Sequence, residues 1–173
     1  MSETTATMRT LKRLETEKEL MYSLRREGKI DVSGEGEEPF KKYNVTVYEG
    51  TYIKPAEECD EPVFCGGPHT FCIEARASYP LKEAPLVVFT SQPPAHINVF
   101  RNSGQVCIGH WNPTETLASE TMHAIRVLFL DPSTFNFNSV ADSSCKNFCS
   151  TYSGGVPGDF PIPCPAFGGD SDG

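Results

Sequence analysis

Residues 92–113 read QPPAHINVFRNSGQVCIGHWNP, an irregular segment that follows neither the period of a helix nor that of a strand. A connection this long inside a compact domain is usually functional. Cys107 lies within the segment, and a cysteine in an exposed loop can present its thiolate to a partner molecule. Asn98 lies nearby, and an asparagine amide can donate a hydrogen bond to the oxyanion that forms when a carbonyl is attacked. We therefore predict that this segment carries the chemistry of the chain.

The residues before this segment predict one helix followed by strands. Residues 8–27 repeat apolar side chains at helical spacing and are followed by Gly28, a common helix stop. From residue 30 the period changes to two, and the segments with the composition of strands are 40–50, 52–56, 70–77 and 85–91. Clusters of Gly, Pro and acidic residues separate them, at 33–39, 57–62 and 66–68. This pattern predicts a helix and then an antiparallel meander of about four strands.

The residues after the segment predict a second helix, at about 114–130. Thr114 is suited to its N-cap, and Asp131-Pro132 ends the helical pattern. The expected buried stripe is Leu117, Thr121, Ala124, Ile125 and Leu128. Beyond residue 143 the chain is rich in Ser, Gly, Pro and Cys. We divide the chain into a flexible N-terminus at 1–7, one folded domain at 8–142 and a C-terminal extension at 143–173.

Charge and composition argue against several classes of protein. The chain has 173 residues and a net charge of −8, from 15 basic and 23 acidic residues, so its field repels the phosphates of nucleic acid. No run of apolar residues is long enough to span a membrane. The seven cysteines are an odd number, and the start of the chain shows no secretory signal. We therefore expect a reducing, cytoplasmic setting with at least one free thiol, and a secreted protein with disulfides is the alternative.

Short motifs follow one another in order over residues 8–142. They are Tyr79-Pro80, Pro85–Phe89, His96-Ile97-Asn98, Gly104–Ile108, Trp111-Asn112-Pro113 and Leu130-Asp131-Pro132. In this order and spacing the sequence resembles the ubiquitin-conjugating enzymes. The resemblance implies an α+β fold of the UBC type, with an N-terminal helix, a four-stranded antiparallel meander, an active-site loop and then a helix. The Cys/Gly/Pro-rich C-terminal segment would follow that domain.

The resemblance implies a function for residues 92–113. Cys107 would accept a ubiquitin-like protein as a thioester from an activating enzyme and pass it to an amine of an acceptor protein, with or without a ligase. Asn98 would stabilise the oxyanion, and His96 would hold the loop in place. His110 is a further candidate, because a histidine three residues from Cys107 can lower the thiol pKa or move a proton. No cofactor or metal ion is expected on this chain.

The predicted first helix has a basic surface on an otherwise acidic protein. Its basic residues are Arg9, Lys12, Arg13, Lys18, Arg25 and Arg26. In the family that this sequence resembles, the first helix receives the activating enzyme. We therefore expect these side chains to be exposed and to speed association with that enzyme, with little effect on stability.

The sequence also departs from the family's pattern. Ile97 replaces the proline of the His-Pro-Asn motif, and the spacing from Asn98 to Cys107 is one residue longer than in the family. Acidic residues usually follow the Asp-Pro motif and orient the incoming lysine, but no carboxylate follows Pro132 here until Asp142. Such departures suggest a distant branch, such as the bacterial ubiquitin-like conjugation systems of phage-defence cassettes.

Two other functions use the same residues. An inactive relative would keep the fold and only present a binding surface, although a retained cysteine at position 107 argues against it. A cysteine hydrolase would pair Cys107 with His110 or His96, but it needs a histidine oriented by a third group, and the sequence shows no recognisable Cys/His order for one. Trp111 is expected to be a packing anchor beneath the loop.

A zinc site is a further alternative. Cys59, Cys65 and His69 are suitable ligands. Their spacing matches no recognised zinc motif, so ordinary thiols are the preferred interpretation. The fourth ligand would have to come from Cys145, Cys149 or Cys164.

Overall fold

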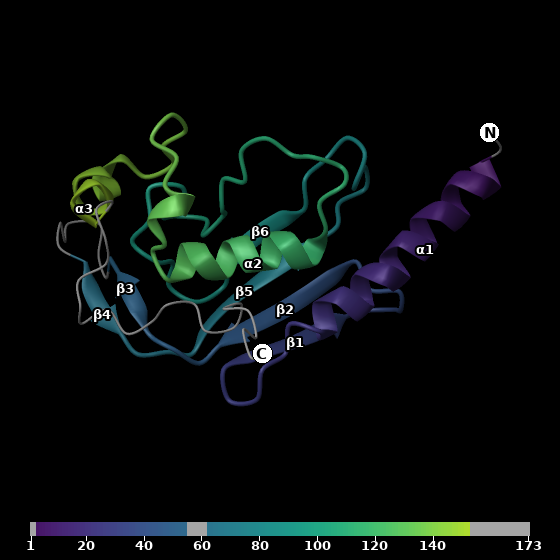
Figure 1. Cartoon of the computed structure of the whole chain (residues 1–173), viewed down its shortest axis with the longest axis horizontal. Coiled ribbons are helices and arrows are strands. Elements are labelled where there is room, and N and C mark those ends of the chain that lie inside the picture. Colours follow the sequence, from purple (N-terminus) through teal and green to yellow (C-terminus); the bar gives the residue numbers. More distant parts are fainter. Residues whose placement is uncertain (1–2, 55–61, 153–173) are drawn as a thin grey trace, which may run out of the picture.

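The computed structural model describes residues 3–54 and 62–152, which form an α+β fold (Figure 1). The helices are α1 (Glu3–Tyr22), α2 (Leu117–Leu128) and α3 (Lys146–Tyr152), with 3-10 turns η1 (Pro132–Thr134) and η2 (Ser143–Cys145). The strands are β1 (Ile30–Glu35), β2 (Lys42–Val47), β3 (Thr51–Ile53), β4 (Val63–Cys65), β5 (His69–Glu74) and β6 (Leu86–Phe89).

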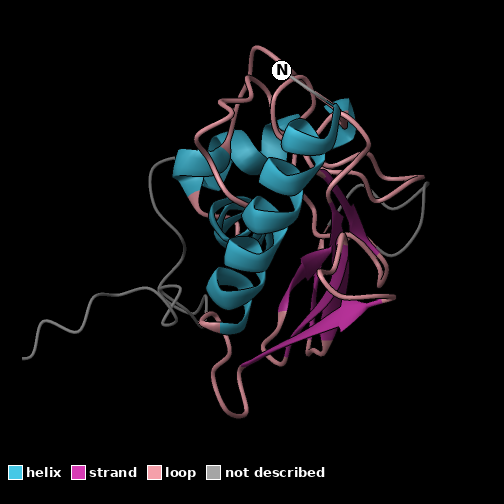
Figure 2. Cartoon of the chain, turned by 90° about the vertical axis from the view of Figure 1, so that its right-hand side faces the viewer, coloured by secondary structure: helices cyan, strands magenta, loops and turns pink. Residues whose placement is uncertain are grey.

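The main sheet is antiparallel, with strand order β1-β2-β5-β6, and the helices lie on one of its faces (Figure 2). This confirms the predicted order of a helix, a four-stranded meander, a loop and a second helix. The membership of the sheet differs from the prediction. The segment predicted at 52–56 contributes β3, which pairs with β4 in a separate two-stranded sheet. The fourth strand of the meander is β1 instead.

Strand β1 was missed because its second half has the composition of a turn, with Ser33, Gly34 and Glu35 in succession. Its first half alternates, with Ile30 and Val32 buried. All six residues pair with β2, so backbone pairing overrides local composition. Gly34 also has a packing role, because a Cβ atom there would lie 2.2 Å from the ring of Phe40.

The core lies between the inner face of the sheet and α2. Alternate residues of β2 and β5 point into it, as expected for a sheet with one covered face. The predicted buried stripe of α2 is confirmed, because Leu117, Thr121, Ala124, Ile125 and Leu128 are fully buried.

The N-cap of α2 is Thr116, two residues later than predicted. Its hydroxyl accepts the backbone N–H of Ser119, whose own hydroxyl oxygen accepts the N–H of Thr116, forming a capping box. Thr114 instead bonds the side chain of Asn112 in the preceding turn.

Helix α1 spans Glu3–Tyr22, five residues earlier at both ends than the predicted 8–27. Residues 3–7 therefore belong to the helix, although we expected them to be flexible. After Tyr22 the backbone forms hydrogen bonds to the residue three positions earlier. The chain then turns into β1 at Gly28, whose φ is 70°. The N-terminal half of α1 extends beyond the sheet (Figure 1), where Met8 is 66% and Leu11 43% exposed.

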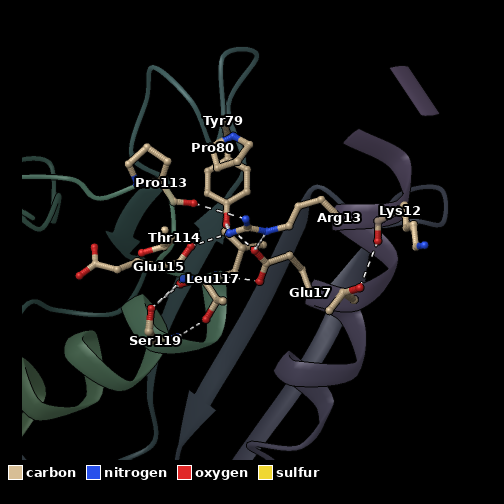
Figure 3. Close-up of polar contacts among 12 residues, drawn as sticks. Lys12, Arg13, Glu17, Tyr79, Pro80, Pro113, Thr114, Glu115, Leu117 and Ser119 are labelled. Carbon is tan, nitrogen blue, oxygen red and sulfur yellow. Dashed lines mark hydrogen bonds and ion pairs between the residues drawn. The ribbon is translucent and has the colours of Figure 1, made fainter. Parts of the chain in front are cut away.

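The C-terminal half of α1 joins α2 through a buried carboxylate (Figure 3). Glu17 is fully buried and accepts the Arg13 guanidinium at 2.8 Å, the Tyr79 hydroxyl at 2.5 Å and the N–H of Leu117 at 2.9 Å. Leu117 is the first residue of α2, where the helix dipole favours negative charge. Burial, together with the Glu17 carboxylate, raises the pKa of Tyr79, so its hydroxyl keeps its proton.

The prediction of a wholly exposed basic surface was wrong at Arg13. Its guanidinium is part-buried and bonds Glu17, the Tyr79 hydroxyl and the carbonyl oxygens of Pro113 and Glu115. It therefore ties α1 to the loop before α2. Lys12, one residue earlier, is exposed and points away from this cluster (Figure 3).

Residues 143–152, assigned above to the C-terminal extension, form η2 and α3. Cys145 and Cys149 are buried and pack with Ala95 and Ile97 in a small second core. Residues 153–173 lie outside the described part of the chain. No helix among the described residues has the length and apolar character to cross a membrane.

Candidate active site

Residues 98–107 form a hairpin that continues the main sheet beyond β6. The N–H of Cys107 donates to the carbonyl oxygen of Asn98 at 2.8 Å, and Val99 faces Val106 across the hairpin. The second arm also bonds β6, because the N–H of Val106 donates to Val87 at 2.9 Å and Gly104 accepts from Phe89 at 2.8 Å. Part of the segment predicted to be irregular is thus a hairpin, and the arm that ends at Cys107 is paired along both of its edges, to residues 98–100 and to β6.

Gly104 is required for this pairing. Its φ is 72°, and a Cβ atom there would lie 2.4 Å from the carbonyl oxygen of Phe89. A side chain at this position would push the hairpin away from β6. The glycine of the Gly-x-Val-Cys-Ile motif therefore positions Cys107 through the sheet.

Cys107 is half-buried, and its thiol lies against the hydroxyl of Ser139. The Sγ and Oγ atoms are 3.4 Å apart, and either can donate. Ser139 belongs to the exposed chain between η1 and η2. Sequence reasoning did not identify it, although it lies in the stretch after Asp131-Pro132 where the family carries acidic residues.

Asn98 is buried, and its side chain holds the chain that carries Ser139. Its Nδ2 donates to the carbonyl oxygens of Asn136 at 2.9 Å and Ser139 at 2.7 Å, and its Oδ1 accepts the N–H of Asn136 at 2.9 Å. Both amide hydrogens are therefore engaged. This geometry favours a positioning role for Asn98 over direct contact with an oxyanion.

His96 connects the start of the hairpin to η1. Its Nδ1 accepts the N–H of Asn98 at 3.0 Å, which fixes the ring proton on Nε2. Nε2 then donates to Thr134 Oγ1 at 2.8 Å, and the Thr134 hydroxyl donates to the carbonyl of Asp131 at 2.6 Å. Burial, with a smaller contribution from His123, lowers the pKa of His96 to about 3. His96 is therefore a neutral part of the scaffold.

Ile97, the residue between His96 and Asn98, has a packing role. Its side chain is fully buried in the second core with Cys145 and Cys149. Its carbonyl oxygen accepts the N–H groups of Ala141 and Asp142, at 2.7 and 3.0 Å. An isoleucine at this position thus packs the entry to α3 against the hairpin. At the other end of the hairpin, Asn98 and Cys107 pair directly.

The other two predicted residues of this region lie apart from the thiol. His110 is exposed, and the contacts of the described residues include no hydrogen bond between it and Cys107. Trp111 is the packing anchor that was expected: its ring lies 5.6 Å from that of Tyr79, and its Nε1 donates to the carbonyl of Pro80 at 2.6 Å.

Of the residues considered for zinc, the described part of the chain includes Cys65 and His69, which are neighbours. His69 is buried, and its Nε2 lies 3.2 Å from the carbonyl oxygen of Cys65. No group of three or more potential metal ligands gathers among the described residues. Cys59 and Cys164 lie outside these residues. Each cysteine that the structure describes is a free thiol.

Comparisons with protein-family models and with curated proteins found no match. Among solved structures, the chain is similar to the E2 domain of a ubiquitin conjugating enzyme from Toxoplasma gondii. The two chains are 18% identical with a TM-score of 0.43, and the match covers 80% of this chain and 92% of that chain. Fewer than one residue in five is shared, so we base the proposed function on this chain's own residues and contacts.

Proposed function

We propose that this chain is a conjugating enzyme of the ubiquitin type. Cys107 accepts a ubiquitin-like protein as a thioester from an activating enzyme and transfers it to an amine of an acceptor protein. The observation that carries the proposal is the half-exposed Cys107 thiol, which lies at the end of a hairpin arm paired along both edges and is 3.4 Å from the Ser139 hydroxyl. The order of motifs around it is the order in ubiquitin-conjugating enzymes.

The reaction needs no cofactor on this chain. The Cys107 thiolate adds to the carbonyl of the activating enzyme's thioester, and that enzyme's thiolate leaves. An amine nitrogen then adds to the Cys107 thioester and loses a proton, and the Cys107 thiolate leaves as the amide forms. Exchange between two thioesters is nearly balanced, so the main contribution of the enzyme is positioning.

From these contacts we propose distinct roles for the residues around the thiol. Asn98 and His96 position the chain between η1 and η2. Ser139 can accept a hydrogen bond from the incoming amine, in the region where the family carries acidic residues. His110 is kept as a candidate for moving the proton that the amine loses.

A hydrolase is supported less well by the same contacts. Both nitrogens of His96 are engaged in the interior, and its pKa is lowered to about 3, so it is a poor general base for Cys107. An inactive binding module has the same fold. It differs from the proposed enzyme only in whether Cys107 becomes charged, that is, loaded with a ubiquitin-like protein as a thioester.

The partners follow from the proposed function. The exposed N-terminal half of α1, with Met8, Leu11 and Lys12, is the surface that we assign to the activating enzyme. A ligase is optional. The departures from the family's motifs lead us to propose a distant branch acting in the cytoplasm, of the kind found in bacterial phage-defence systems.

Charging of Cys107 tests this proposal. With an activating enzyme, ATP and a ubiquitin-like protein, the chain is expected to gain one adduct on a non-reducing gel that thiol removes. Cys107→Ala should abolish the adduct, and Cys107→Ser should give either a thiol-stable ester or no adduct. Cys72→Ala, at a half-buried cysteine on the outer face of β5, is the control and should charge normally. A thiol-labile adduct on Cys107→Ala would assign the carrier role to another cysteine.

A further inference from the structure

A pocket of about 400 Å³ lies beside the hairpin that carries Cys107. Phe100, Arg101 and Ser103 line it from the hairpin turn, and residues 141–144 form the opposite wall. This opposite wall is held to the hairpin by the two hydrogen bonds that the carbonyl oxygen of Ile97 accepts. The pocket is therefore built on the same backbone that positions the thiol.

The pocket is within reach of a peptide whose lysine enters the site. Gly104 is three residues from Cys107, and extended chain spans roughly 3.3 Å per residue, so the turn lies on the order of 10 Å from the thiol. Ser139, which contacts the thiol, is two residues before Ala141 on the other wall. An acceptor segment with its lysine at Cys107 would thus lay a neighbouring residue over the pocket.

The Arg101 guanidinium has no protein partner among the described residues. Its Nη2 is buried without a hydrogen bond. Four other arginines, in contrast, donate to carbonyl or carboxylate oxygens: Arg13, Arg25, Arg26 and Arg76. A buried, unpaired guanidinium nitrogen is unfavourable, and a carboxylate ligand can satisfy it with two parallel hydrogen bonds.

The charges around the pocket favour an anion. Lys54 is 6% exposed and donates from behind one wall to Ser144, at 2.8 Å to Oγ and 3.3 Å to the carbonyl oxygen. Asp142 contributes the carboxylate among the described residues that line the pocket. Its oxygens already accept the N–H and hydroxyl of Ser144 and the thiol of Cys145. The pocket lining thus holds one cation, Arg101, whose Nη2 has no hydrogen bond, and one carboxylate that is already bonded within its own loop, while Lys54 adds a second positive charge next to Ser144.

We propose that this pocket binds an acidic side chain of the acceptor protein, located within about four residues of the lysine that is modified. Arg101 pairs with that carboxylate, and Ser103 and Ser143 offer hydroxyl groups beside it. Phe100 is 44% exposed at the rim and can cover the aliphatic part of the bound segment. This inference rests on the proposed function, because it names the acceptor that the charged Cys107 prefers.

Single-turnover discharge of the charged chain tests the pocket. The acceptors are peptides with one lysine and one glutamate, placed in turn at each position up to four residues away, and matched glutamine peptides. The best glutamate peptide is expected to react about tenfold faster than its glutamine match, the effect of one charge-assisted pair. Arg101→Gln should remove this difference and Arg101→Lys should keep part of it. Arg26→Gln, an exposed arginine elsewhere, should leave it unchanged.

A binding measurement separates this inference from the proposed function. In an NMR titration of the uncharged chain, the best glutamate peptide should shift the Arg101 side-chain resonance and the amides of Ser143 and Ser144, and the glutamine peptide should not. If the charged chain transfers its cargo to free lysine but reacts equally fast with the glutamate and glutamine peptides, the pocket is overturned and the proposed function stands. If the glutamate peptide shifts these resonances but Cys107 never forms a thioester, the pocket is supported and the proposed function is overturned.

Discussion

Replacing Glu17 with alanine is expected to lower the free energy of unfolding by about 3–5 kcal/mol, the usual cost of removing one partner of a buried charge pair. The substitution would leave the Arg13 guanidinium, the Tyr79 hydroxyl and the N–H of Leu117 without their shared acceptor. Arg13→Glu should be similarly destabilising, because it would place a second carboxylate beside Glu17 and leave the carbonyl oxygens of Pro113 and Glu115 unpaired.

Urea denaturation followed by circular dichroism measures this effect. Lys12→Glu is the matched control, because Lys12 precedes Arg13 on the exposed side of α1, and its reversal should change stability by no more than about 0.5 kcal/mol. Equal unfolding free energies for Glu17→Ala and Lys12→Glu would show that the buried cluster does not hold α1 to α2. For Arg13 this differs from the expectation, drawn from the sequence, that the basic side chains of the first helix have little effect on stability.

Asn98→Ala is expected to slow discharge of the charged enzyme to lysine by about 10²-fold, because misplacing a reacting group by 1 Å can cost that much. The side chain of Asn98 holds the backbone of Asn136 and Ser139, and Ser139 contacts the thiol. The effect should therefore arise through the position of the whole segment 136–139, including the Ser139 hydroxyl. Ser139→Ala alone should slow discharge less, by about tenfold.

A double-mutant cycle in single-turnover discharge distinguishes positioning from direct catalysis. If Asn98 acts by placing Ser139, then adding Ser139→Ala to Asn98→Ala should change the rate little further. If the rate losses of the two single variants multiply in the double variant, this account is contradicted. That result would favour an Asn98 amide that contacts the oxyanion itself. Unfolding measurements on the same variants show how much of the loss comes from stability, which should fall by about 1–3 kcal/mol in Asn98→Ala.

The spacing of apolar residues predicted the elements that bury one regular face. The stripe of α2 and the strands β2, β5 and β6 have apolar residues at regular spacing, and the sheet and α2 bury them. Strand β1 has only Ile30 and Val32 as a signal, and β3 and β4 are each three residues long, too short to show a period. Met8 and Leu11 share the helical spacing of apolar residues in 8–27 but are exposed, because this half of α1 extends past the sheet.

The sequence indicated which residues form the candidate site, but it did not indicate how their side chains are directed. Composition and motif order indicated Cys107, Asn98 and the anchoring Trp111. The direction of the Asn98 amide was not readable, because it depends on carbonyl oxygens of residues 136 and 139 that fold back over the hairpin. Ser139 has no local signal either, since a lone serine in a polar stretch has many structural roles.

Transfer from Cys107 to an amine is the central claim, and one measurement tests it directly. The full chain is charged, separated from the activating enzyme and ATP, and mixed with labelled lysine, and the products are followed by intact-protein mass spectrometry. We predict a thioester that maps to Cys107 and then moves to lysine as a thiol-stable amide, faster than water hydrolyses it. A chain that is never charged, or a thioester that only hydrolyses in the presence of lysine, would contradict the account.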